Sequence, residues 1–185
     1  PVIERRIEEH SLRYPNLAIE IDRTARTATF AIRGPVSVPA SAEEIHQQGA
    51  DCWPLALARE LDDAFLHFRF NEPTIGHWLL RSHGDLAAVA AIDDLLDAAG
   101  DDWLVRETIS MIRRTLKRLE LSARSTTAMI EPGSCFAGWL FELALAGDRS
   151  YMLDGPWDSP GDTANDVAKL RLSPLNFGAL AMGNG

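Results

Sequence analysis

The feature that most constrains the fold of this chain is the alternation of strand-like and helix-like segments along its 185 residues. Two runs of alternating apolar and polar side chains at 17–33, around a turn at 23–26, predict a β-hairpin. Further strands are expected at 75–80, 126–130, 149–153 and 169–172. Apolar residues at helical spacing predict helices at 53–69, 85–99, 101–120 and 136–146, with a shorter one ending near Gln48. Such alternation is typical of an α/β fold with a largely parallel sheet.

The domain organisation expected from the sequence is a linker over residues 1–16 and one α/β domain over 17–185. A chain of 185 residues suits a single domain of this class. Ser41 and Asp101 are the predicted N-caps of two helices, and 154–168 is expected to form a loop. The sequence begins with proline rather than methionine and stops in a Gly-rich stretch, so we expect a piece of a longer chain.

The charge of the chain argues against two classes of partner. Its formal net charge is -9, whereas duplex nucleic acid and anionic membranes both favour basic proteins. The two cysteines, Cys52 and Cys135, are interpreted as reduced thiols rather than as a disulfide framework. The histidines lack the spacing of metal ligands, so no metal site is expected. No secretory signal and no membrane-spanning run is visible, and we expect a cytoplasmic protein.

Two turns between a strand and a helix carry the groups most relevant to chemistry. The first surrounds Gly84, before the helix at 85–99. The second precedes the helix at 136–146, which carries one carboxylate, Glu142, in an otherwise apolar run. Backbone amides at the start of a helix are unpaired, so two such turns on neighbouring strands can direct two amides at one carbonyl oxygen. That arrangement is an oxyanion hole, which stabilises an enolate or a tetrahedral intermediate.

The second turn resembles the signature region of the enoyl-CoA hydratase (crotonase) family, where a Gly-rich turn leads into a helix with Glu-Leu-Ala and a terminal Asp. The matching run is Gly-Trp-Leu-Phe-Glu-Leu-Ala-Leu-Ala-Gly-Asp at 138–148. The segments 82–86 and 172–185 resemble the family's earlier oxyanion turn and its later Pro- and Gly-containing region. This resemblance spans about residues 17–185. It implies a crotonase-like spiral of ββα units that is truncated before the C-terminal assembly helices.

A narrower resemblance rests on Trp-Leu-Val-Arg-Glu-Thr-Ile at 103–109 and Ile-Glu-Pro-Gly-Ser-Cys-Phe-Ala-Gly at 130–138. Both runs are similar to the second half of a ring-opening lyase of aromatic catabolism, which carries two crotonase-like halves in one chain. The resemblance implies that the parent protein uses water to open the ring of an oxygenated (2,3-epoxy or dihydrodiol) benzoyl-CoA, releasing formate and an aldehyde-bearing CoA thioester. It implies no cofactor, because the CoA thioester is the substrate. The implied partners are the N-terminal half of the same protein and a second copy in a homodimer.

Position by position, the family resemblance implies that the backbone amides of Gly84 and Trp139 are the oxyanion donors. It places Glu142 where the family often has a catalytic carboxylate. Under this interpretation, the site lies between the two turns described above and receives the thioester carbonyl of the substrate.

Several positions depart from the family pattern. Pro174 stands where the family has its second carboxylate, and Trp139 and Leu140 replace glycines. Arg81 stands where the first half of the lyase is expected to carry a cysteine. We therefore expect this half to be degenerate and structural. Two alternatives stay open: a non-catalytic crotonase-like scaffold that mediates dimerisation, and an enoyl-CoA hydratase or isomerase homologue.

Two other features have simpler interpretations. Cys135 lies in a turn but has no recognisable base beside it in the sequence, so it is interpreted as a structural thiol. A group of basic side chains near the end of the helix at 101–120 is compatible with binding of a CoA phosphate. A solvated helix end that complements the helix dipole is the favoured interpretation. This group consists of Arg113, Arg114, Lys117 and Arg118.

Overall fold

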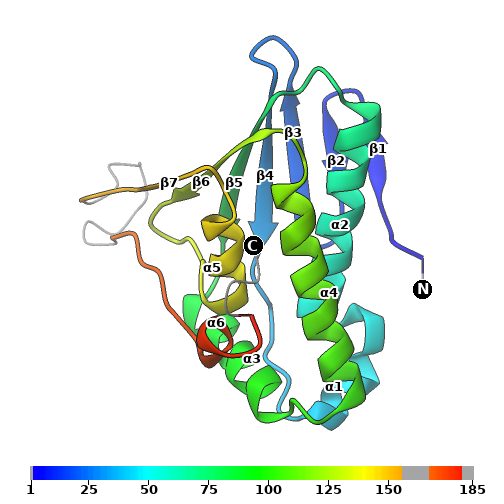
Figure 1. Cartoon of the computed structure of the whole chain (residues 1–185), viewed down its shortest axis with the longest axis vertical. Coiled ribbons are helices and arrows are strands. Elements are labelled where there is room, and N and C mark those ends of the chain that lie inside the picture. Colours follow the sequence, from blue (N-terminus) through cyan, green and yellow to red (C-terminus); the bar gives the residue numbers. More distant parts are fainter. Residues whose placement is uncertain (1, 156–166, 181–185) are drawn as a thin grey trace.

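The computed structural model describes residues 2–155 and 167–180, where the seven strands of one sheet follow the order of the chain. The strands are β1 (Arg6–Glu8), β2 (Ser11–Arg13), β3 (Leu17–Asp22), β4 (Thr27–Arg33), β5 (His77–His83), β6 (Ser125–Ile130) and β7 (Arg149–Met152). The helices are α1 (Ala42–Gln48), the 3-10 helix η1 (Gly49–Asp51), α2 (Trp53–Asn71), α3 (Leu86–Ala98), α4 (Trp103–Glu120), α5 (Gly138–Leu145) and α6 (Pro174–Phe177). Figure 1 shows α2 and α4 side by side along the sheet, with α3, α5 and α6 grouped near its lower end.

The predicted α/β class is confirmed, but the sheet is mixed rather than largely parallel. Strands β1 to β4 pair in antiparallel fashion. Strands β4 to β7 pair in parallel. The difference follows from the connections, because short turns join antiparallel neighbours whereas parallel neighbours need a helical crossover. Only the connections after β4 contain helices.

The N-terminal segment is not the predicted linker, because its residues 6–13 form β1 and β2 of the sheet. The same segment is bonded to α2. The Tyr14 hydroxyl donates to Asp63 over 2.8 Å, and Asn16 donates two hydrogen bonds to the buried Glu60 over 3.0 and 2.9 Å. Each of these strands has three residues, which is too short for an alternating pattern to show in the sequence.

The centre of the core is a cluster of four aromatic rings between the sheet and α2. Phe30 of β4 lies with its ring centroid 5.8 Å from Phe65, 5.2 Å from Phe68 and 5.1 Å from Trp78. Trp78 of β5 stacks on Phe65 at 5.5 Å with an interplanar angle of 9°. All four side chains are at most 1% exposed. Because aromatic rings bury large apolar areas, this cluster holds α2 against β4 and β5.

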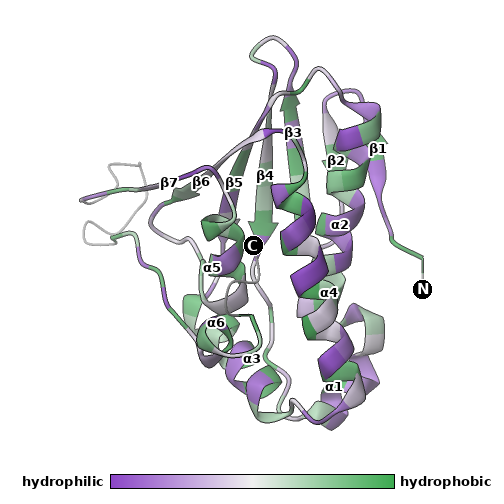
Figure 2. Ribbon diagram, viewed as in Figure 1, coloured by the Kyte–Doolittle hydropathy of each residue, from purple (hydrophilic) through white to green (hydrophobic). Residues whose placement is uncertain are grey.

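The two longest helices are amphipathic, and Figure 2 shows polar and apolar residues interleaved around both α2 and α4. The apolar side of α4 is buried against the core through Ile112, Leu116 and other residues. Its polar side carries the basic group predicted from the sequence. No helix in the described parts of the chain is both long and apolar enough to span a membrane.

Of the two helix N-caps predicted from the sequence, one is confirmed and the other is wrong by one residue. The Ser41 side chain caps α1 as predicted, accepting from the amide of Glu44 over 3.3 Å. For α4 the cap is Asp102 and not the predicted Asp101. Its carboxylate accepts from the amides of Leu104 and Val105 over 2.8 and 3.1 Å. Two adjacent aspartates satisfy the sequence rule equally, and only the backbone path decides between them.

The strand predicted at 169–172 does not form. In its place a single parallel bridge joins Ala137 to Arg171. The short helix α6 that follows was not predicted. Its N-cap is Ser173, which forms a capping box with Asn176, and Pro174 occupies the first helical position.

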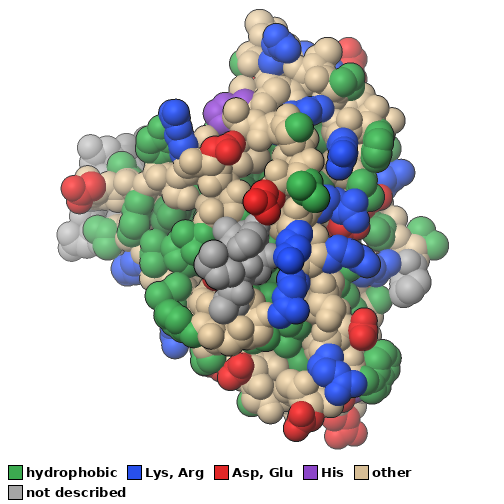
Figure 3. Space-filling view, viewed as in Figure 1, with side chains coloured by type: hydrophobic (Ala, Val, Ile, Leu, Met, Phe, Trp, Pro, Cys, Tyr) green, Lys and Arg blue, Asp and Glu red, His purple; other side chains and the backbone are tan. Residues whose placement is uncertain are grey.

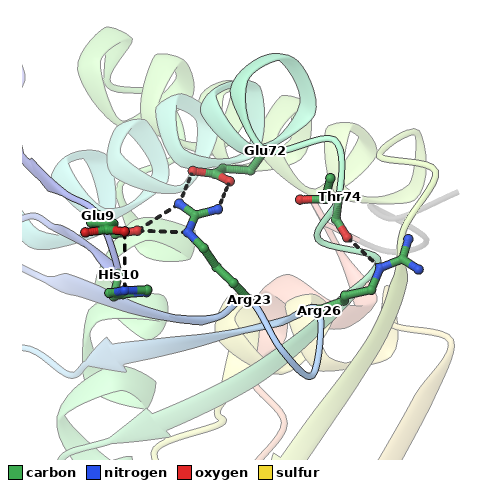
Figure 4. A network of polar contacts seen from close by, with 6 residues as sticks. All are labelled: Glu9, His10, Arg23, Arg26, Glu72 and Thr74. Carbon is green, nitrogen blue, oxygen red and sulfur yellow. Dashed lines mark hydrogen bonds and ion pairs between the residues drawn. The ribbon is translucent and has the colours of Figure 1, made fainter.

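The tip of the β3–β4 hairpin is tied to the end of α2 by one arginine (Figure 4). Arg23 donates to both carboxylate oxygens of Glu72 over 2.7 and 2.9 Å and to the carbonyl of Glu9 over 3.2 and 2.8 Å. The hydrogen bond from Arg23 lowers the pKa of Glu72. Beside it, Arg26 donates to the carbonyl of Thr74 over 3.1 Å. These contacts join the β1–β2 turn, the hairpin and α2 at one end of the molecule.

The aromatic cluster gives a prediction about stability. Replacing Phe65 by alanine is expected to lower the free energy of unfolding by about 3 to 5 kcal/mol, because it leaves a cavity between α2 and Trp78. The matched control is Phe70→Ala on the same helix, whose side chain is 72% exposed and whose loss is expected to cost under about 0.5 kcal/mol. Urea unfolding at 25 °C measures both. Equal losses in the two variants would show that the cluster does not hold the fold.

Candidate functional site

The first predicted turn is a meeting point of three loops. Gly84 follows β5 with φ of +153°, and its amide donates to the carbonyl of Gly133 over 3.1 Å. A Cβ atom placed on Gly84 would lie 2.9 Å from the Cα of Gly34. Only glycine fits such a close approach between two backbones. Because its amide donates to Gly133, Gly84 already has a hydrogen-bond acceptor within the protein.

The second predicted turn brings α5 against α3. Gly138 begins α5 with φ of +48°, and the next amide, that of Trp139, donates to the Asp93 carboxylate over 2.8 Å. A Cβ atom on Gly138 would lie 1.7 Å from Oδ2 of Asp93. The glycine thus provides the space in which a side chain of α3 reaches the start of α5.

Asp93 is fully buried and has no cationic partner among its hydrogen bonds. Besides the Trp139 amide, the hydroxyl of Ser173 donates to Oδ2 over 2.8 Å. The other oxygen, Oδ1, has no hydrogen-bond partner among the described residues. Burial raises the pKa of Asp93 to about 7, against the opposing effect of the hydrogen bonds from Ser173 and Trp139. A buried carboxylate with so few donors is easier to protonate because its charged form lacks solvation.

Glu142, the predicted catalytic carboxylate, lies in the same buried neighbourhood. Its Oε1 accepts a hydrogen bond from the side-chain amide of Asn176 over 2.7 Å. Asn176 also donates to the carbonyl of Gly138 over 3.0 Å and accepts from the amide of Ser173 over 2.8 Å. We call Asp93, Glu142, Ser173 and Asn176 the α5 polar cluster. No member is more than 9% exposed.

The structure thus brings two of the three predicted site residues together. Trp139 and Glu142 lie within or beside the α5 polar cluster, whereas Gly84 packs against Gly34 and near the sulfur of Cys135. That thiol is buried, and burial raises its pKa. Cys135 is therefore a packed core side chain and lacks the lowered pKa of an activated nucleophile.

Three members of the α5 polar cluster were not predicted from the sequence: Asp93, Ser173 and Asn176. Asp93 shows a weak sequence signal, because it falls on the apolar side of α3 beside Val89, Ala90, Ile92 and Leu96. A carboxylate at such a position must find donors or lose its charge. Ser173 and Asn176 match the pattern of a helix start around a proline.

Two further positions behave as surface residues. Arg81 stands where the first half of the lyase is expected to carry a cysteine, and its guanidinium forms an ion pair with Glu131 over 2.6 Å. His83 packs against Gly133 beside the first turn. Across residues 2–155 and 167–180 there is no group of three or more His, Cys, Asp or Glu side chains that could hold a metal ion.

Comparison with known proteins extends the family resemblance. No family model matches the chain. Over 184 residues, however, the chain is 49% identical to benzoyl-CoA-dihydrodiol lyase of Aromatoleum evansii, which confirms the narrower resemblance. The match covers 99% of this chain and 32% of that protein. The chain therefore spans about a third of the length of the curated relative that it matches.

Solved structures show the same fold at low sequence identity. An enoyl-CoA hydratase of Geobacillus kaustophilus superposes with a TM-score of 0.52 at 18% identity, over 100% of this chain and 56% of that one. DspI of Pseudomonas aeruginosa superposes with a TM-score of 0.53 at 17% identity, over 89% of this chain and 55% of that one. This chain is thus a homologue of about one third of benzoyl-CoA-dihydrodiol lyase and has the crotonase-like α/β fold of the enoyl-CoA hydratases.

Proposed function

We propose that this chain is part of a benzoyl-CoA-dihydrodiol lyase and serves there as a structural half without a working thioester site. The parent enzyme would use water to open the ring of an oxygenated benzoyl-CoA, releasing formate and an aldehyde-bearing CoA thioester. The sequence identity of 49% to benzoyl-CoA-dihydrodiol lyase, over nearly the whole chain, supports the first part of the proposal. The contact between Asp93 and the Trp139 amide supports the second.

An oxyanion hole works only if its amides are free to meet the developing negative charge. Here the Trp139 amide is bonded to a carboxylate, and the Gly84 amide is bonded to the carbonyl of Gly133. When Asp93 is ionised, it also places a negative charge where an enolate oxygen would have to bind. Like charges at that distance repel strongly in a buried environment. Both effects oppose thioester chemistry at this turn.

Glu142 is equally poorly placed for acid–base work. A general acid or base must come within hydrogen-bond reach of a substrate proton. Glu142 is only 4% exposed, and one of its oxygens is held by Asn176. Pro174, at the position of the family's second carboxylate, begins α6 and has no proton to exchange. These features disfavour an enoyl-CoA hydratase or isomerase activity for this chain.

A scaffold role is favoured by exposed apolar side chains around α5, β7 and α6. Tyr151 is 52% exposed, Met152 47% and Phe177 76%. Large apolar side chains that gather on a surface are typical of faces that another protein surface covers. We propose that this face packs on the N-terminal half of the lyase or on a second copy in a homodimer.

The proposal predicts that the isolated chain does not bind the substrate class. Calorimetric titration with benzoyl-CoA is expected to show no saturable heat up to about 1 mM, which corresponds to a binding free energy weaker than about -4 kcal/mol. The control is an Asp94→Asn variant, which removes an exposed charge beside Asp93 and should behave like the unmodified chain. Saturable binding that disappears in a folded Trp139→Pro variant would show a working site and overturn the proposal.

In a full-length lyase that contains this segment, Glu142→Gln is expected to change kcat/KM by less than about threefold, provided that the variant folds. A true general acid or base contributes about 10² to 10⁴ in rate. Steady-state kinetics on the ring-opening reaction measures the difference, and circular dichroism checks the fold. A loss of a hundredfold or more in folded enzyme would assign Glu142 to the catalytic machinery.

Asp93 predicts a specific pH dependence of stability. Its folded pKa of about 7 lies above the ordinary value of 3.8, so the folded state binds the proton more tightly than the unfolded state. The corresponding stability is present at low pH and is lost as pH rises through 7. Between pH 5 and 7, the Asp93→Asn variant is expected to gain about 2 to 3 kcal/mol relative to the unmodified chain, at about 1.4 kcal/mol per pH unit, and little more between pH 7 and 8 because Asp93 is then ionised in both the folded and the unfolded state.

Urea unfolding at pH 5 and pH 8 tests this expectation, with Asp97→Asn, an exposed aspartate of the same helix that does not affect the pKa of Asp93, as the matched control. Asparagine keeps an oxygen for the Trp139 amide and carries no charge. If the two variants respond to pH in the same way, the Asp93 carboxylate does not carry the effect.

A further inference from the structure

A groove of about 450 Å³ lies where the C-terminal parts of α2 and α4 meet, and none of its lining residues belongs to the α5 polar cluster. It is lined by Arg69, Ser110, Arg113, Arg114, Lys117, Arg118 and Leu121. All five charged side chains in this lining are cations, although the chain carries a net charge of -9. Figure 3 shows the blue side chains gathered along α4 on this face. We call this surface the α4 basic groove.

Within residues 2–155 and 167–180, most of these cations have no carboxylate partner. Arg118 pairs with Asp62 over 2.6 Å and is the one member of the five with such an ion pair in the described ranges. Arg114 donates to the sulfur of Met111, and Arg113 donates to the carbonyl of Ala179. Neither of these acceptors carries a charge. Among the described residues, four of the five cations in the groove thus form no ion pair with a carboxylate.

The helix dipole explains only part of this arrangement. Lys117 and Arg118 lie in the last turn of α4, where cations are stabilised by the carbonyl end of the helix. Arg113 and Arg114 lie a further turn back, where that effect has faded. Cations spaced four residues apart on a helix repel one another. A structural role alone would not favour this spacing.

The groove also contains exposed apolar surface, and a second exposed apolar side chain follows one of its lining residues in the chain. Leu121 is 68% exposed, and Phe70, next to Arg69, is 72% exposed. The guanidinium of Arg69 lies 5.9 Å from the centre of the Phe70 ring. The aliphatic stems of arginine and lysine add further apolar surface beneath the charges. The groove thus offers cations and apolar contacts within one small area.

These observations fit a short acidic protein segment better than a nucleic acid. The cations from Arg113 to Arg118 span about 8 Å along the helix at 1.5 Å per residue. A duplex presents its charges over a much longer track, and the net charge of -9 on this chain would repel it. A peptide with a few carboxylates beside an apolar side chain matches both the length and the composition of the groove.

We propose that the α4 basic groove is a docking surface for an acidic segment of a protein partner. Its carboxylates would pair with Arg69, Arg114 and Lys117, and an apolar side chain would pack on Leu121. Such pairs at a surface mainly set specificity and the rate of association. This inference does not depend on the proposed lyase function, because the groove lies outside the α5 polar cluster.

The test is fluorescence anisotropy with a labelled peptide of four glutamates and two leucines, titrated with the whole 185-residue chain at low salt. The variant Arg114→Glu with Lys117→Glu reverses two charges in the groove. The matched control, Arg106→Glu with Arg149→Glu, changes the net charge equally through two exposed arginines outside the groove. We expect binding to weaken by about tenfold or more in the groove variant and by less than about twofold in the control. The same peptide with glutamines in place of glutamates is expected not to bind.

Three outcomes would overturn the proposal. One is the absence of saturable binding by the folded, unmodified chain. Another is an equal loss of affinity in the groove and control variants, which would mean that net charge alone attracts the peptide. The third is displacement of the peptide by tripolyphosphate at concentrations below the dissociation constant of the peptide, which would mark a site for small anions. Circular dichroism of each variant confirms that the fold is intact.

Discussion

The buried carboxylate of Asp93 is the constraint on which the candidate site depends. An ionised group in a protein interior is costly unless donors surround it. Asp93 obtains its donors from two segments that are distant in the chain, the amide of Trp139 and the hydroxyl of Ser173. Satisfying one carboxylate therefore fixes the start of α5 and the segment that leads into α6 against α3. Gly138 makes this possible, because any side chain there would occupy the position of the carboxylate.

The same contact supports the proposal that this chain keeps a crotonase-like fold without a working thioester site. Both strand-to-helix turns are present, as in a protein that binds a thioester between them. Their amides are used internally, one by a backbone carbonyl and one by a side chain. Under this proposal, the turns serve only to join loops and helices. Fold and chemistry are separable in this way because a turn needs only some acceptor for its amide, and the acceptor need not be a ligand.

Long patterns in the sequence predicted the fold well. The β3–β4 hairpin, α2, α3, α4 and α5 each extend over enough residues for periodicity to be visible, and all were found. Short elements were missed, because β1, β2 and α6 have three or four residues each. The choice between Asp101 and Asp102 as a helix cap depends on the backbone path.

The candidate site was less predictable, for a different physical reason. The sequence located the turns at Gly84 and Trp139 but could not name the partners of their amides. The acceptor for Trp139 is 46 positions away, and Asp93 looks like any acid in a mixed helix until the rotation of α3 is known. Tertiary packing sets that rotation, so the bond between Asp93 and Trp139 is visible only in three dimensions.

The order of the strands in the sheet has a consequence for how the protein is made. Among the described residues, each strand from β2 to β7 pairs with the strand that precedes it in the chain. A ribosome releases the chain from its N-terminus, so each new strand emerges after the strand it needs has already been synthesised. Growth of the sheet can thus proceed in one direction during translation, without waiting for a distant segment. At every stage the newest strand is one of the two edges of the sheet, and the next segment of the chain protects this edge from pairing with other molecules.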